Sequence, residues 1–61
     1  MKKTATYKVV IHTPKAKSYD ALIVDASGIR WAIENASRKF REKYPSLIEG
    51  ADFEIIEVEK V

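Results

Sequence analysis

Residues 25–44 are the one long segment of this chain whose hydrophobic residues repeat with a helical period. At about 100° per residue, a helix places five of them on one stripe, with Ala32 at its edge. These five are Ile29, Ile33, Ala36, Phe40 and Tyr44. Pro45 should end the helix, because the residue before a proline is pushed out of the helical region. Ser27 is the expected N-cap, with Asp25 as the alternative.

The remaining segments are too short for long helices and have the composition of β-strands. In residues 4–13, Tyr7, Val9 and Ile11 alternate with Lys8, Val10 and His12, which is the period of a strand with one wetter face. A turn containing Pro14 leads into residues 18–25, where hydrophobic residues fall on both faces. Residues 53–58 show the same two-sided pattern, and a β-bulge near Ile55 would bring its two rows onto one face.

The order of these segments predicts an α+β fold, β-β-α-β, with one helix packed on one face of a three-stranded sheet. We expect one small domain covering residues 1–61. The short turn makes the first two strands antiparallel neighbours, whereas the third strand could flank either of them. We favour the order 2-1-3, with the first strand in the centre, because it makes all pairings antiparallel.

The short chain limits how such a fold can be stabilised. A domain of about 60 residues buries only about 60% of the surface that its unfolded chain exposes. Disulfides, metal ions or association usually supply the missing stability. The sequence contains no cysteine and one histidine, His12, so we expect no disulfide, no metal site and no cofactor. Association is the route that remains.

A single helix leaves the second face of the sheet open. That face should carry the four hydrophobic residues Val10, Tyr19, Ala21 and Ile23. Without the bulge, it would also carry Phe53 and Ile55. Large apolar patches are rare on monomers, and open sheet edges expose unpaired backbone groups. We therefore expect a homo-oligomer formed through the helix-free face or a sheet edge, with a protein partner as a further option. The alternative is that Lys8, His12 and the acidic residues keep this face hydrated.

The charge is uneven along the chain and suggests a second function. Residues 1–45 hold ten Lys or Arg and four Asp or Glu, a net charge of +6, and residues 46–61 hold one Lys and five acids, a net charge of −4. Basic and acidic strands could neutralise each other across the sheet. Alternatively, a basic surface could bind nucleic acid, with Trp31 stacking on a base although Glu34 and Glu42 interrupt it. Its residues would be Arg30, Trp31, Arg38 and Arg41 on the helix and Lys15 and Lys17 on the hairpin.

Catalytic patterns are absent from the sequence. His12 lies near a turn without a nucleophile pattern, no serine stands in a Gly-x-Ser-x-Gly context, and only Gly28 and Gly50 are present, too few for a phosphate-binding loop. No apolar run approaches the roughly 20 residues of a membrane span, and the basic start at Met1 leads into a strand rather than a signal peptide. We expect a cytoplasmic, non-enzymatic interaction or accessory protein.

Overall fold

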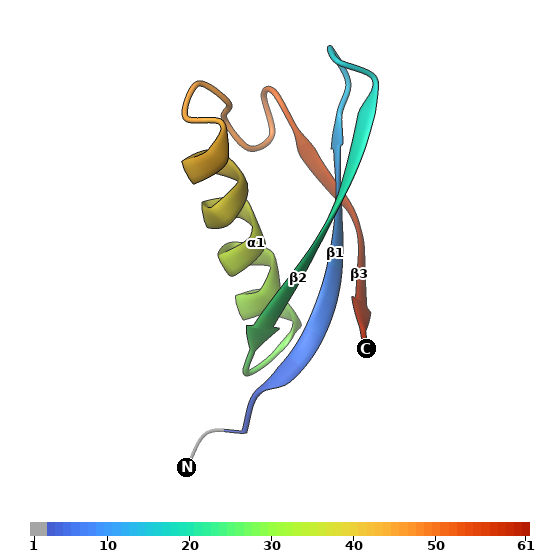
Figure 1. Cartoon of the computed structure of the whole chain (residues 1–61), viewed down its shortest axis with the longest axis vertical. Helices are drawn as coiled ribbons and strands as arrows, with labels where there is room; N and C mark the ends of the chain where they lie inside the picture. Colours follow the sequence, from blue (N-terminus) through green and yellow to red (C-terminus); the bar gives the residue numbers. More distant parts are fainter. Residues whose placement is uncertain (1–2) are drawn as a thin grey trace.

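The computed structural model describes residues 3–61 and confirms the predicted β-β-α-β order. The elements are β1 (Ala5–Thr13), β2 (Ser18–Ala26), α1 (Ile29–Lys43) and β3 (Glu54–Lys60). β1 lies in the centre of the sheet and pairs antiparallel with β2 and with β3, so the order is β2-β1-β3 (Figure 1). The prediction made from the start of the chain, that it is no signal peptide, concerns Met1 and Lys2, which lie outside the described residues.

The core lies between α1 and the face of the sheet that it covers. Tyr7, Val9 and Ile11 point to this face from β1, and all three are buried. Two helix alanines, Ala32 and Ala36, are fully buried, and their small side chains let the helix backbone approach the sheet closely. The helix side of this core also includes Phe40, whose ring lies 4.8 Å from that of Phe53 and 5.1 Å from that of Tyr44.

The prediction that the whole helix stripe is buried is wrong at both of its ends. Ile29, at the start of α1, is 57% exposed. Tyr44, the C-cap, is also exposed, although its ring packs on that of Phe40. The buried stripe instead runs through the middle of the helix and includes Ser37. Ile33, at the edge of this stripe, is only partly buried. The predicted end of the helix is confirmed, since Tyr44 is its C-cap and Pro45 follows.

The predicted N-cap is also wrong. The N-cap is Gly28, whose backbone is extended, and no side chain caps the first turn. Asp25, the alternative N-cap, does not cap the helix because it is part of β2. Its carboxylate accepts a hydrogen bond from the Thr6 hydroxyl at 2.8 Å. Its backbone carbonyl accepts a hydrogen bond from the Asn35 side chain at 3.2 Å, which ties the end of β2 to α1.

A β-bulge in β3 decides which of its side chains face the core. Val10 pairs with Glu57, but the next residue of β1, Ile11, pairs with Ile55, so Ile56 is the extra residue. The bulge turns Ile55 and Val58 toward the helix, where both pack against the core. The predicted bulge is therefore confirmed, and the alternative that exposes Phe53 and Ile55 on the open face is wrong, because Phe53 is buried.

The connection from α1 to β3 is tied back onto the helix. The Ser37 hydroxyl donates a hydrogen bond to the Glu49 carboxylate. Gly50 has a φ of 86°, a left-handed conformation that glycine adopts without a steric cost, and its N–H donates to the carbonyl of Phe53 at 2.8 Å. These contacts hold Glu49 beside the start of β3. Among residues 3–61, no helix is both long enough and apolar enough to cross a membrane.

Candidate interaction surfaces

The helix-free face of the sheet has three rows of side chains with different chemistry. The row on β2 is mainly apolar, the row on β1 is mixed, and the row on β3 is mainly acidic. The rows are Tyr19, Ala21, Ile23 and Asp25 on β2, Thr6, Lys8, Val10 and His12 on β1, and Glu54, Ile56, Glu57 and Glu59 on β3. The apolar part of the face is thus displaced toward β2, and its negative charge is gathered on β3.

The four residues predicted for self-association lie together on this face. In the sheet register, Val10 stands opposite Ala21, and Ile23 follows two positions along β2. Tyr19 is 66% exposed and Ile23 is 57% exposed, whereas Val10 in the central strand is half-buried. Ile56 is also exposed, and the sequence did not indicate this because its position depends on the bulge in β3.

Side-chain contacts at one end of the helix-free face join all three strands. The His12 ring stacks on the Tyr19 ring with a centroid distance of 4.4 Å and an interplanar angle of 14°. His12 Nδ1 lies 3.4 Å from Oε1 of Glu54, so one aromatic pair connects the rows of all three strands. Lys8 stands opposite Glu59 in the register, consistent with partial charge compensation between β1 and β3. The helix-free face therefore has defined side-chain contacts at this end, beside the apolar row on β2.

The residues predicted for nucleic-acid binding fall into two separate groups. Trp31 is 53% exposed, and it lies in the first half of α1 on the surface that carries the exposed side chains Arg30, Arg38 and Arg41. The hairpin that carries Lys15 and Lys17 lies at the other end of the molecule from the start of α1 (Figure 1). Lys15 Nζ is 3.9 Å from Oδ1 of Asp52. The helix residues thus share one element with Trp31, whereas the hairpin lysines lie apart from it.

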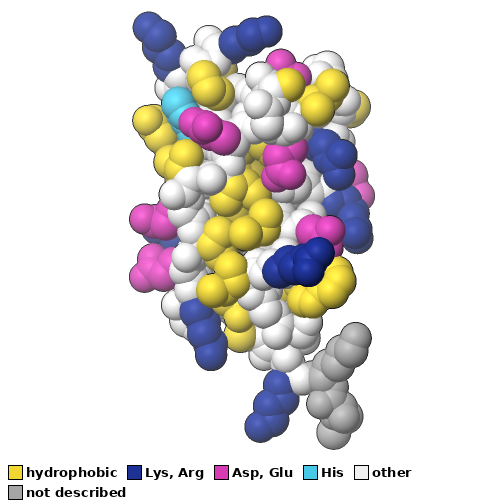
Figure 2. Space-filling view, turned by 180° about the vertical axis from the view of Figure 1, so that it is seen from behind, with side chains coloured by type: hydrophobic (Ala, Val, Ile, Leu, Met, Phe, Trp, Pro, Cys, Tyr) yellow, Lys and Arg dark blue, Asp and Glu magenta, His cyan; other side chains and the backbone are white. Residues whose placement is uncertain are grey.

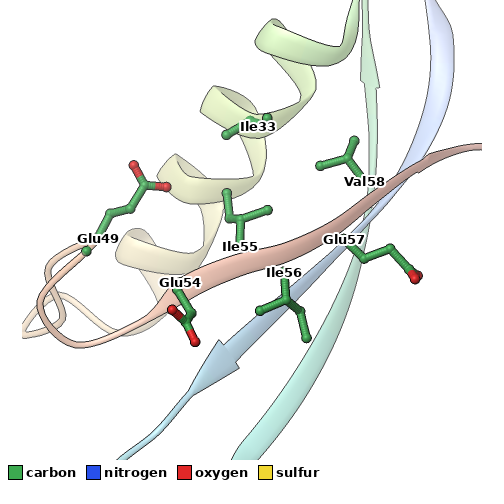
Figure 3. A pocket seen from close by; sticks show the side chains of 8 residues that line it. Ile33, Glu49, Glu54, Ile55, Ile56, Glu57 and Val58 are labelled. Carbon is green, nitrogen blue, oxygen red and sulfur yellow. The ribbon is translucent and has the colours of Figure 1, made fainter.

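A groove that the sequence did not indicate follows the outer edge of β3. Figure 2 shows the side of the molecule opposite to Figure 1, where hydrophobic side chains form a band along the middle with acidic side chains on both sides of it. The groove has a volume of about 530 Å³, and Ile33, Ile55 and Val58 point toward one another inside it (Figure 3). Glu54, Ile56 and Glu57 point to the other side of the strand, and Glu49 stands at one end.

Comparison with known proteins gives no relative from which a function could be inferred. No protein-family model, no curated protein and no solved structure matches this chain. In the part of the chain that the structure describes, no three His, Asp or Glu side chains gather where they could hold a metal ion. The features that could carry a function are therefore the sheet faces, the sheet edges and the outer surface of α1.

Proposed function

We propose that this chain is a small non-enzymatic interaction protein that self-associates through the β2 side of its helix-free sheet face. The observation that carries the proposal is the exposed apolar row of Tyr19, Ala21 and Ile23 on β2, extended by Val10 on β1. Contiguous apolar patches on small proteins commonly mark interaction sites. A chain of 61 residues also has much to gain from association, because its own core is small.

The distribution of charge favours one way of stacking two copies. A two-fold axis that sets the β2 row of one copy against that of the other buries apolar side chains and keeps the two β3 rows apart. Stacking the β3 rows would instead place Glu54, Glu57 and Glu59 against the same residues of the second copy. Like charges that face each other are destabilising, so the β2-centred arrangement is the one we propose.

The size of the helix-free face limits how tightly two copies should bind each other. β1 and β2 have nine residues each. At usual strand dimensions the outline of these two strands with the shorter β3 beside them is at most about 30 Å by about 14 Å. Because the proposed contact uses only the β2 side of this face, we expect it to bury less than the roughly 800 Å² of accessible surface per partner of a standard stable interface. We therefore expect association in the micromolar range rather than an obligate dimer.

Sedimentation velocity between about 10 µM and about 1 mM protein tests this proposal. Ile23→Glu should shift the chain to a monomer, because it places a carboxylate in the apolar row. Ile29→Glu is the matched control, since Ile23 and Ile29 are both 57% exposed but Ile29 lies at the start of α1, away from the helix-free face. Circular dichroism verifies that both variants fold. A wild type that stays monomeric throughout, or equal effects of the two substitutions, contradicts the proposal.

The exposed Trp31 supports a second candidate function, binding of single-stranded nucleic acid by the outer surface of α1. Exposed aromatic rings stack on unpaired bases, and the nearby Arg30 and Arg38 could contact phosphates. Trp31 is the only tryptophan, so its fluorescence reports directly on this surface. Binding of a single-stranded oligonucleotide should quench it and weaken as salt is raised, and Arg38→Ala should reduce the affinity. Unchanged fluorescence at low salt would count against this candidate.

A further inference from the structure

The groove beside β3 exists because the helix does not cover the sheet evenly. α1 packs more closely along β2 than along β3, and this leaves space above the outer edge of β3. The floor of that space is apolar, with Ile33 from the helix and Ile55 and Val58 from the strand (Figure 3). A groove between a helix and the edge strand of a sheet can accept an extended peptide that adds a strand to the sheet.

The backbone of β3 offers hydrogen-bonding groups along this edge. Val61 donates its N–H to the carbonyl of Thr6 at 2.8 Å, and Tyr7 pairs with Lys60 in the register. Hydrogen-bonded and non-hydrogen-bonded pairs alternate in an antiparallel ladder. The backbone groups of Val61 and Glu59 therefore point to β1, whereas those of Val58 and Lys60 point away from it. In the sheet formed by residues 3–61, β3 is an edge strand, so these groups face solvent.

The side chains around this edge are strongly acidic. Glu54, Glu57 and Glu59 follow the helix-free side of β3, and Glu49 stands at the end of the groove. Among the described residues, neither Glu57 nor Glu59 forms an ion pair. A ligand that lies along β3 would meet Ile55 and Val58 on its helix side, with Lys60 at the end of the strand, and carboxylates on its other side.

We propose that the edge of β3 binds an extended, basic segment of a partner protein as the fourth strand of the sheet. A residue opposite Val58 points toward the helix and packs on Ile33, so it should be aliphatic. Its neighbours along the segment point to the opposite side, where cross-strand side chains lie about 5 Å apart, so beside Glu57 and Glu59 they should be Lys or Arg. The recognised pattern alternates basic and aliphatic residues.

A second copy of this chain fits the same edge poorly. Pairing β3 with β3 would place glutamates beside glutamates, which destabilises cross-strand pairs. The other edge strand, β2, carries Asp20 and Asp25 and no basic residue. The proposed peptide site is also separate from the β2 side of the helix-free face, so both surfaces could be occupied in one molecule.

Titration of the ¹⁵N-labelled full chain with two synthetic peptides tests the proposal. The probe is acetyl-Lys-Val-Lys-Val-Lys-Val-amide, and the matched control replaces each lysine of the peptide by glutamate. The lysine peptide should shift the amide signals of Val58, Lys60 and Ile33 in a saturable way, more weakly at high salt. The glutamate peptide should shift none of them. Equal binding of both peptides, or shifts confined to the hairpin and β2, would overturn the proposal.

A charge exchange on the protein makes the test specific for this edge. The double variant Glu57→Lys and Glu59→Lys should bind the lysine peptide about tenfold more weakly and should gain binding of the glutamate peptide. Glu34→Lys with Glu42→Lys is the control, because it changes the net charge equally on the exposed surface of α1. An equal loss in both double variants would mean that only overall charge matters, and it would overturn the site.

N-methylated peptides test whether the bound segment forms backbone hydrogen bonds to β3 as a strand. One version of the lysine peptide is N-methylated at every valine and another at every lysine, so each lacks the N–H donors of one side. Only one side of an added strand bonds to β3. Loss of binding with one version but not with the other supports strand addition. Unchanged binding with both versions would show that side chains alone are recognised, and the proposed strand would be wrong.

Discussion

The two faces of the same sheet contrast most clearly along β1. Val9 and Ile11 point to α1 and are fully buried, whereas Val10 and His12 point to the helix-free face and are half-buried. The covered face is closed by apolar side chains from α1 and the connection after it. The open face mixes an apolar row, an aromatic pair and a row of glutamates.

This difference separates the residues that hold the fold from those that are available for binding. Burial of apolar area stabilises the monomer on the covered face, where water is excluded. On the open face the same kinds of side chain remain in contact with water, so their removal should cost the monomer little. Substitutions that are matched in chemistry but placed on opposite faces can therefore test the division.

The largest difference in the free energy of unfolding should be between substitutions of two aromatic residues of α1, one buried and one exposed. Phe40→Ala should lower the free energy of unfolding by roughly 3–5 kcal/mol, because its buried ring packs between those of Phe53 and Tyr44. Trp31→Ala should cost less than about 1 kcal/mol, since the ring is half in water. Urea denaturation followed by circular dichroism measures both, at a concentration where the chain is monomeric.

The same pair of variants checks the rotation of the helix. If Trp31→Ala proves more destabilising than Phe40→Ala in a monomer, the assignment of the two helix surfaces is reversed. The nucleic-acid candidate would then fail with it, because the arginines near Trp31 would no longer form an exposed surface.

A second contrast uses neighbouring valines of β1. Val9→Ala should destabilise the monomer by about 2 kcal/mol, because it leaves a cavity at a fully buried position. Val10→Ala should cost less than about 1 kcal/mol, but it should weaken self-association because Val10 belongs to the apolar part of the open face. Denaturation gives the first quantity and sedimentation the second. Equal destabilisation by the two substitutions would show that the open face is buried in the monomer too.

The sequence predicted the architecture because its signals there are local. The period-2 pattern of Tyr7, Val9 and Ile11 in β1, the short turn at Pro14 and the stop at Pro45 each depend on neighbouring residues only. The order β2-β1-β3 followed from short connections and the preference for antiparallel pairing. The same alternation correctly put Val10, Tyr19, Ala21 and Ile23 on the face away from α1.

The misassigned features depend on where elements end and how they sit on one another. Helical periodicity does not say that Ile29 and Tyr44 stay exposed at the two ends of α1, nor that the helix begins after Gly28 without a side-chain cap. The groove beside β3 could not be predicted, because it results from the position of α1 over the sheet and from the bulge at Ile56. The sequence indicated only that residues 46–61 carry a net charge of −4.

The smallest expected effect concerns the aromatic pair of the open face, which contrasts with the Phe40–Phe53 pair of the core. The stacked rings of His12 and Tyr19 should contribute about 0.5–1 kcal/mol to monomer stability, because the pair is partly solvated. A double-mutant cycle with Tyr19→Ala and His12→Ala measures this coupling by urea denaturation. Tyr19→Phe should retain it, since the ring is kept. A coupling near zero would mean that the open face is not held in one arrangement before a second copy binds, and its association should then carry an additional ordering cost.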